Sequence, residues 1–329
     1  MVNVEKEELA MALGKAQKLS QKSFGKRIRF YAPSFVYYKS RDYSSSPAAF
    51  PSISVTASSC SLNCKHCGST VLNTMYPATS PGRLLELCKD LKSKGAVGCL
   101  ISGGCISDGS VPLEGFVDTM AEVKRELGLT LVVHTGVVGR DMAKQLSQAG
   151  VDAALIDVIG SDETIREICH LNLTVRDYEK SLQALREAEV PMVPHILVGL
   201  HYGQVVGEFR ALEIVAGSSP SAVIIIVFMP IRGTAMEQVA PPDPSDIGKV
   251  LAAARFMMPR TPLVLGCMRP KDPYRAKVDV IAVRAGVNAI AFPAEEAVEL
   301  AKSLGYEISF SSLCCSQIFS DLKDERVQT

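Results

Sequence analysis

Three cysteines lie within eight positions of the segment SSCSLNCKHCGST, residues 58–70. Three residues separate Cys60 from Cys64, and two separate Cys64 from Cys67. The residues between and after them are polar or small, which indicates a loop rather than a core strand. Buried free cysteines behave as small hydrophobic residues, so three thiols together in a polar loop point to metal or redox chemistry.

Two kinds of site compete for these three cysteines, which we call the loop thiols. A structural zinc ion takes four ligands, usually in two pairs. No second CxxC pair occurs, although His66 or a distant cysteine could complete a zinc set. The CxxxCxxC spacing instead allows one loop to hold three corners of a [4Fe–4S] cluster, leaving the fourth iron for another ligand. The spacing therefore favours a cluster over zinc.

Four further cysteines are dispersed in sequence. Cys105 and Cys267 lie at the carboxyl ends of predicted strands, while Cys314 and Cys315 are adjacent on a C-terminal tail. If the tail folds back, the four thiols meet and can hold a second, auxiliary [4Fe–4S] cluster. Nearby serines offer an oxygen ligand if one thiol is not used: Ser311, Ser312 and Ser316. The alternatives for the adjacent pair are a vicinal disulfide or chance.

The other three cysteines carry weaker signals. Cys88 lies on the apolar stripe of a predicted helix, so we expect it in the core. Cys99 lies on a predicted strand with its side chain toward the helices, which also favours a core position. Cys169 precedes another helix and could approach the site, so the sequence leaves it undecided.

The elements that must position these residues alternate along the chain. Short β-branched runs are followed by longer stretches of helical period, several of which end in Gly. The predicted strands are residues 52–57, 98–102, 129–135, 153–159, 192–198, 222–229, 262–267 and 288–292. Eight successive strand–helix units are typical of a (β/α)₈ barrel, in which chemistry takes place at the carboxyl ends of the strands. A doubly wound open sheet is the second choice, because no Gly-rich phosphate loop follows the first strand.

The sequence therefore predicts an α/β fold, a (β/α)₈ TIM-type barrel with an N-terminal helical arm and a C-terminal tail that folds over the barrel mouth. A Ser/Pro-rich stretch at 41–52 separates the arm from the barrel. The predicted domains are the arm (1–50), the barrel (51–308) and the cysteine-bearing tail (309–329).

Composition narrows the function. Lys+Arg and Asp+Glu are equal at 35 each, so no basic field favours nucleic acid. The longest apolar run, at 222–231, is too short to cross a bilayer, which needs about 20 residues. The amphipathic N-terminal segment has no apolar signal region, so we expect a cytoplasmic protein. Ten cysteines in such a protein favour metal or redox work over disulfides.

The triplet after the first strand, together with CLISGGC at the second, resembles the radical S-adenosylmethionine (SAM) superfamily. The resemblance implies that the open iron binds SAM, and that one electron cleaves it to methionine and a 5′-deoxyadenosyl radical. It implies cofactor contacts for Gly103 and Gly104 after the second strand, and for His66 before the last loop cysteine. The superfamily often has Glu after the two glycines. Cys105 stands there instead, which makes it a candidate ligand of the second cluster.

The segment DYEKSLQALREAEVPMVPHILVGLHYG, residues 177–203, resembles the biotin-synthase-like branch. This resemblance implies that Arg176 pairs with the SAM carboxylate and that Asp157 or Asp162 contacts the ribose. FMPIRGT at 228–234 is expected to line the adenine, with Arg232 reaching a carboxylate; a glycine turn that ends a buried strand is an equal alternative. Biotin synthases carry further cluster ligands on strands three and five, and this chain has no cysteine there.

Within this branch, two clusters and the segment RFYAPSF at 29–35 resemble the archaeal type of two-protein lipoyl synthase. The resemblance implies sulfur insertion into a protein-bound octanoyl or mercapto-octanoyl chain. The two partner proteins divide two such insertions, and the resemblance favours the second of them for this chain. It also implies a second radical SAM component, an octanoylated acceptor protein or peptide and an electron donor as partners. The alternatives are another radical SAM enzyme (metal-cofactor assembly, methylase or mutase) and a non-catalytic zinc scaffold. His134 and His201 lie near strand ends, and we expect both to be structural.

Overall fold

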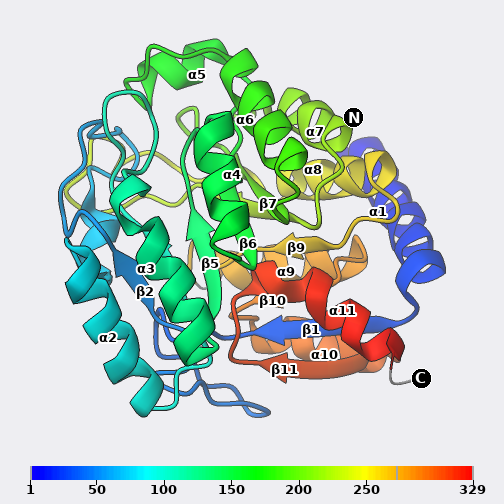
Figure 1. Cartoon of the computed structure of the whole chain (residues 1–329). Helices are drawn as coiled ribbons and strands as arrows, with labels where there is room; N and C mark the ends of the chain where they lie inside the picture. The colour runs from blue at the N-terminus through cyan, green and yellow to red at the C-terminus, as the bar shows by residue number, and fades with distance from the viewer. Residues whose placement is uncertain (1, 272, 328–329) are drawn as a thin grey trace.

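A computed structural model describes residues 2–271 and 273–327 of the 329-residue chain. Its strands form one curled, parallel sheet in the order β11-β1-β10-β9-β8-β7-β6-β5-β4-β2-β3 (Figure 1). The strands are β1 (Arg27–Tyr31), β2 (Ser52–Ser54), β3 (Tyr76–Pro77), β4 (Gly98–Ser102), β5 (Thr130–His134), β6 (Ala153–Asp157), β7 (Met192–Val198), β8 (Val223–Val227), β9 (Leu263–Leu265), β10 (Ala289–Ala291) and β11 (Glu307–Ser311).

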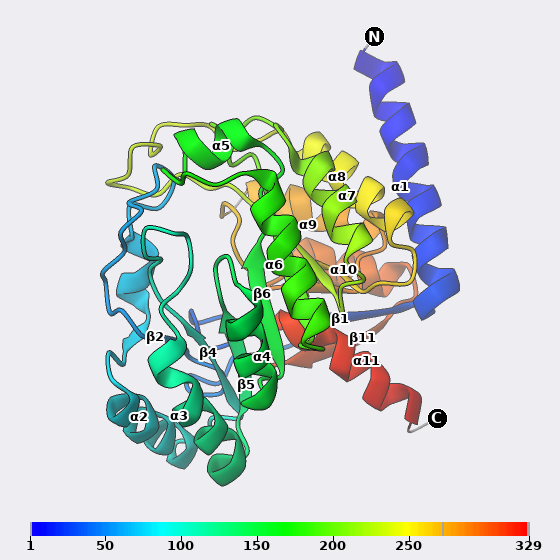
Figure 2. The same ribbon diagram turned by 45° about the horizontal axis from the view of Figure 1, so that its top comes forward.

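Helices lie along the outer side of this sheet, and the N-terminal helix packs against two later ones, α8 and α9 (Figures 1 and 2). The helices are α1 (Val2–Phe24), α2 (Pro81–Ser93), α3 (Val117–Glu122), α4 (Arg140–Gln148), α5 (Asp162–Glu167), α6 (Val175–Glu187), α7 (Glu208–Gly217), α8 (Pro244–Met257), α9 (Tyr274–Arg284), α10 (Glu295–Ser303) and α11 (Ile318–Val327). Short 3₁₀ turns cover Thr70–Thr74 (η1), Glu114–Phe116 (η2) and Cys315–Gln317 (η4), and Val123–Leu127 (η3) is a π-helical turn. Among the described residues, no helix is both long and apolar enough to cross a membrane.

Local sequence explains where these elements form. The β8 run VIIIV is buried along its whole length, as expected for a parallel strand covered on both faces. Helix α2 begins where the Ser80 side chain accepts a hydrogen bond from the Arg83 N–H, with Pro81 in the first turn. Helix α6 begins with a reciprocal capping box between Thr174 and Asp177. These start signals place the helices that support the strand ends.

The eight predicted strands are confirmed as β2 and β4–β10, but the sheet differs from a closed eight-stranded ring. Three further strands extend it to eleven, and the row has two edges, β11 and β3. The structure is thus a curled half-barrel. The added strand β1 lies within the predicted arm and pairs with both β10 and β11, and β11 crosses the predicted boundary at residue 308. The predicted arm and tail therefore both contribute strands to the sheet.

The C-terminal tail was expected to fold over the mouth of the barrel. In the structure it instead enters the curve of the sheet. Its 3₁₀ turn η4 contacts both β6 and β10, which lie four places apart in the strand order, so only an element inside the curve can contact both. Cys314, Cys315 and Ser316 are accordingly buried. The following helix α11 is tied to β1 through Asp321, which bonds to Arg29 and Tyr31. The apolar character of the tail explains why it is internal.

A buried ion pair holds the strand ends near Cys267. Arg269 and Asp279 are fully buried, with Nε–Oδ1 and NH2–Oδ2 separations of 2.7 and 2.9 Å. The guanidinium also donates to the carbonyls of Gly266, Ala291 and Phe292. This one side chain therefore joins the end of β9, the end of β10 and helix α9.

We expect Arg269→Met to lower the free energy of unfolding by about 3–5 kcal/mol, because it leaves the Asp279 carboxylate buried without its partner. Urea unfolding followed by circular dichroism measures the loss. The matched control, Arg41→Met, breaks a pair with Glu299 whose side chains are 76% and 57% exposed; it should cost less than about 1 kcal/mol. Equal losses in the two variants would contradict the assignment.

Candidate iron–sulfur and cofactor site

The loop thiols lie on a tightly turned segment between β2 and η1. Asn63 and Gly68 have positive φ angles of 45° and 48°, which Asn and Gly tolerate best. Within the loop, the carbonyl of Cys64 accepts hydrogen bonds from the N–H groups of Cys67 and Gly68. These turns allow three thiols from one short segment to line the same cavity.

The loop is docked on residues 167–170, which end helix α5. The Lys65 N–H donates to the Ile168 carbonyl at 2.9 Å, and the His170 Nδ1 lies 2.9 Å from the Leu62 carbonyl oxygen. The Lys65 ammonium group donates to the Tyr202 hydroxyl at 2.7 Å, and that hydroxyl donates to Glu167. These contacts position the thiols against the end of α5 before any ligand binds.

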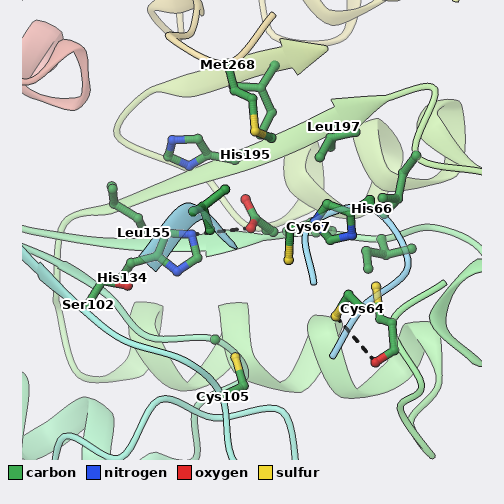
Figure 3. Close-up of a pocket in the computed structure, with 18 of the residues that line it drawn as sticks. Cys64, His66, Cys67, Ser102, Cys105, His134, Leu155, His195, Leu197 and Met268 are labelled. Carbon is green, nitrogen blue, oxygen red and sulfur yellow. Dashed lines mark hydrogen bonds and ion pairs between the residues drawn. The ribbon is translucent and has the colours of Figure 1, made fainter. Parts of the chain in front are cut away.

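One cavity of about 410 Å³ at the carboxyl ends of the strands contains most of the predicted site, within the usual range of ligand pockets, about 300–1,000 Å³. Its lining is mainly apolar and includes Leu155, Leu197 and Met268 (Figure 3). Eleven of the fourteen predicted site residues line it: Cys60, Cys64, His66, Cys67, Gly103, Gly104, Cys105, Asp157, Cys267, Cys314 and Cys315.

Asp162, Arg176 and Arg232, predicted to contact SAM, do not line the cavity in this structure. Asp162 accepts a hydrogen bond from the Val175 N–H at 2.7 Å and so holds the start of α6. Arg176 and Arg232 are exposed. Helix α6 reaches the cavity through buried Tyr178 instead. Contacts from these three residues to SAM stay predictions.

The four thiols predicted to hold one auxiliary cluster fall into two groups. Burial raises the pKa of Cys105 to about 12, with further increases from the charges of Cys60, Asp157 and Cys67. Burial likewise raises the pKa of Cys267, and the charge of the neighbouring Cys314 thiolate raises it further. Cys105 thus stands with the loop thiols. Cys267, Cys314 and Cys315 form a separate group, which we call the second thiol set.

Within the second thiol set, the contact between Cys314 and Cys315 shifts the pKa values of the two thiols in opposite directions. Contact with Cys315 lowers the pKa of Cys314 to about 7, while that contact and burial raise the pKa of Cys315. The side chains that follow, Ser316 and Gln317, bury Oγ and Nε2 atoms that have no hydrogen-bond partner. Three thiols beside buried polar atoms without partners fit a group that supplies those contacts.

A buried polar atom without a hydrogen-bond partner also lies beside the loop thiols. This atom is the Nδ1 of His66, which is buried and has no hydrogen-bond partner.

The remaining cysteines are placed largely as expected. Cys88 and Cys99 are buried neighbours in the core, so both core predictions are confirmed. Cys169, left undecided by the sequence, lines the cavity, and the Cys64 thiol lies 3.6 Å from its carbonyl oxygen. The donors present therefore fit a cluster on each side of the cavity.

Gly104 is the residue on which the loop thiols pack most closely. A Cβ there would lie 2.5 Å from the Cβ of Cys60 and would overlap the carbonyl oxygen of Ser59. The Gly104 N–H also donates to the Thr56 hydroxyl at 2.7 Å. Glycine is required here because two backbone segments touch.

We expect Gly104→Ala to displace Cys60 and to lose most of the iron held by the loop thiols after anaerobic reconstitution. Iron analysis and visible absorbance measure the loss. Gly139→Ala is the control, since a Cβ at Gly139 meets nothing within 4 Å. Normal iron content in the Gly104 variant would show that the loop tolerates displacement.

Three polar side chains that no sequence motif connects meet at the centre of the cavity. His134, Asp157 and His195 come from the neighbouring strands β5, β6 and β7. Figure 3 shows His134 and His195 in the cavity. His134 Nε2 lies 3.4 Å from Asp157 Oδ2, and the two imidazole rings have centroids 6.0 Å apart. Although burial acts in the opposite direction, His134 lowers the pKa of Asp157 to about 2, and Asp157 raises that of His134. The cavity thus contains a close His134–Asp157 pair that can hold a polar group of a ligand.

His195 behaves differently from His134. Burial lowers its pKa to about 4, and its Nδ1 lies 3.1 Å from the Val193 carbonyl. The neutral ring can therefore donate from Nδ1 and present Nε2 as an acceptor in the cavity. His134 was expected to be structural; its place in the cavity makes it a candidate contact instead.

The low pKa of His195 predicts a pH dependence of stability. The folded state favours the neutral ring, so its contribution is complete above the ordinary pKa of 6.5 and is lost as the pH falls toward 4. Between pH 7 and 5 we expect His195→Gln to remove about 1–2 kcal/mol of this loss. Urea unfolding at pH 7 and pH 5 measures the free energy of unfolding of both proteins. If this free energy fell by the same amount in the variant as in the unchanged protein, a neutral His195 would be contradicted.

Comparisons with known proteins agree with this site. Residues 54–204 match the model of the Radical SAM superfamily. A biotin synthase of Prochlorococcus marinus is 25% identical over 247 residues, which cover 72% of each chain. The biotin synthase of Aromatoleum aromaticum is 27% identical over 246 residues, 72% of this chain and 73% of its own.

Solved structures share the fold. Methylornithine synthase matches with a TM-score of 0.61 and 17% identity over 96% of this chain and 92% of its own. HydG, a maturase of the [FeFe]-hydrogenase, matches with a TM-score of 0.66 and 14% identity over 98% of this chain and 74% of its own. At such identities the likeness concerns the fold alone. The comparisons therefore show that residues 54–204 of this chain are similar to the Radical SAM superfamily, and that biotin synthases are among its relatives.

Proposed function

We propose that this chain is a radical SAM sulfurtransferase that inserts sulfur into a protein-bound octanoyl or mercapto-octanoyl chain, forming the lipoyl cofactor with a second radical SAM component. One observation carries the proposal: a single apolar cavity is lined by the loop thiols and also by the second thiol set. A radical generated near one group can act on a chain held beside the other. The biotin synthases among the relatives support sulfur insertion as the reaction class.

In this proposal the loop thiols would hold a [4Fe–4S] cluster, and Cys267, Cys314 and Cys315 would hold the auxiliary one, with the Ser316 hydroxyl near enough in sequence to assist. When bound, reduced cluster and SAM supply a 5′-deoxyadenosyl radical, and the auxiliary cluster supplies sulfur. Gly103 and Gly104 would contact SAM, and the close packing of Gly104 on Cys60 would hold the end of β4 beside the loop thiols. The apolar lining would hold the aliphatic chain and exclude water, and the His134–Asp157 pair would orient a polar group.

The partners follow from this chemistry: an octanoylated acceptor protein or peptide, an electron donor and the second component. We also infer a cytoplasmic location, where thiols and clusters remain reduced. Other radical SAM chemistry, such as metal-cofactor assembly, methylation or a mutase reaction, would share the loop thiols but would not transfer sulfur to the acceptor chain.

Anaerobic incubation with SAM, dithionite and an octanoylated or mercapto-octanoylated peptide tests the proposal, with product mass as the readout. We expect a gain of sulfur, greater with the mercapto-octanoyl peptide, and completion to lipoyl when the second component is added to the octanoyl peptide. Formation of 5′-deoxyadenosine without sulfur transfer would favour the other radical chemistries. A colourless protein without iron would favour a zinc scaffold.

A further inference from the structure

Cys105 is bound to the loop that carries the loop thiols. The N–H of Ser61, which lies between Cys60 and Cys64 in the sequence, donates a hydrogen bond to the Cys105 carbonyl at 2.8 Å. The preceding residue, Gly104, is in direct contact with Cys60, as its close approach shows. The backbone of Cys105 is therefore fixed relative to the loop thiols by a hydrogen bond on one side and by packing on the other.

The Cys105 side chain lies in the same region. It lines the same cavity as Cys60, Cys64 and Cys67. Cys105 follows β4, whereas Cys267 follows β9, and four strands separate these two in the sheet. Cys169 also lines the cavity on the side of the loop thiols, where its carbonyl oxygen lies 3.6 Å from the Cys64 thiol. The Nδ1 atom of His66, which belongs to the same loop, is buried without a hydrogen-bond partner.

We propose that Cys105 is a fourth thiolate ligand of the cluster held by the loop thiols, occupying in the absence of SAM the iron that SAM takes when it binds. A [4Fe–4S] cluster accepts four cysteine thiolates, and the loop alone supplies three. This inference rests on the iron–sulfur part of the proposed function and is independent of the identity of the acceptor chain.

The exchange involves no change in oxidation state. The iron–sulfur bond to Cys105 would break with its electron pair left on sulfur. The carboxylate and amino groups of SAM would take the vacated position, and the proton that the ammonium group of SAM loses on binding would pass through water to the freed thiolate. The consequence is a resting cluster protected from loss of iron, and a SAM affinity reduced by competition with an internal ligand.

The test uses the full chain carrying Cys314→Ala and Cys315→Ala, so that only the loop-side cluster is present. This parent is compared with versions that also carry Cys105→Ala or Cys105→Ser, and with Cys169→Ala as the control for a neighbouring thiol. Each is reconstituted anaerobically, and iron content and visible absorbance confirm that a cluster is present. Absence of iron in the parent would overturn the proposed function itself, and this inference with it.

Ferricyanide treatment then reports the fourth ligand. We expect the Cys105 variants to lose about one of about four irons and to give the electron paramagnetic resonance signal of a three-iron cluster, because a cluster with three thiolates has one labile iron. The parent and the Cys169 variant should resist. Equal loss from the parent and the Cys105 variants would overturn the inference while leaving the cluster assignment intact.

SAM binding gives an independent readout. In equilibrium dialysis we expect SAM to bind the Cys105 variants at least about 10-fold more tightly than the parent, equivalent to about 1.4 kcal/mol. The resonance spectra of the reduced parent and the Cys105→Ser variant should differ without SAM and coincide with it. Identical spectra without SAM, or unchanged or weaker binding, would overturn the inference.

Discussion

Replacing Cys64 with alanine is expected to abolish the reductive cleavage of SAM, lowering 5′-deoxyadenosine formation at least about 1,000-fold, which corresponds to about 4 kcal/mol of barrier. Cys64 is the buried member of the loop thiols, and its thiol lies against the carbonyl of Cys169. Without it the loop supplies too few ligands to hold a cluster. Chromatography of anaerobic reactions with dithionite and SAM measures the product.

Iron analysis separates loss of the site from loss of the fold. We expect Cys64→Ala to lose about four of about eight iron atoms per chain while remaining folded by circular dichroism. Cys88→Ala is the matched control, because Cys88 is also buried but lies in the core away from the cavity. Full SAM cleavage by the Cys64 variant would overturn the assignment of Cys64 as a ligand of the cluster.

Replacing Cys314 with alanine is expected to have a different outcome: sulfur transfer is lost, but SAM cleavage is retained. Cys314 lies in the second thiol set beside Cys315 and Cys267, separate from the loop thiols. Iron content should again fall by about four atoms, and 5′-deoxyadenosine should stay within about threefold of the unchanged protein, about 0.7 kcal/mol. Product mass from the mercapto-octanoyl peptide measures sulfur transfer.

Cys267→Ala should reproduce this result, because it removes another thiol of the same set from a different strand end. Cys99→Ala serves as the control for a buried cysteine away from the cavity. Unchanged iron content in both the Cys314 and Cys267 variants would exclude an auxiliary cluster on these thiols. Loss of SAM cleavage together with sulfur transfer would indicate that the two thiol groups do not act separately.

The sequence predicted the repeating part of the fold well, because each strand–helix unit carries its own signals. β-Branched runs such as VIIIV at β8 and caps such as Ser80 at α2 act within a few residues. Strands β1 and β11 lack that advantage. RIRFY contains two arginines, and its partners β10 and β11 lie at the other end of the chain, so no local pattern reveals the pairing.

The candidate site divides in the same way. The loop thiols could be identified because their spacing is a local property of one segment. The grouping of Cys105 could not, since the sequence places it only at the end of a strand, and the ends of β4 and β9 lie on different parts of the cavity. His134 and His195 belong to no motif. Only the register of β5, β6 and β7 brings them to Asp157.

The pairing of β1 with β10 and β11 has a consequence for biosynthesis. During translation β1 emerges first, yet its neighbours in the sheet follow only after nearly the whole chain has been made. The turn that carries Cys314 and Cys315 comes later still and must enter a sheet whose other strands are already present. The second thiol set is therefore assembled last, so a nascent chain can present the loop thiols for iron loading before the second thiol set is complete.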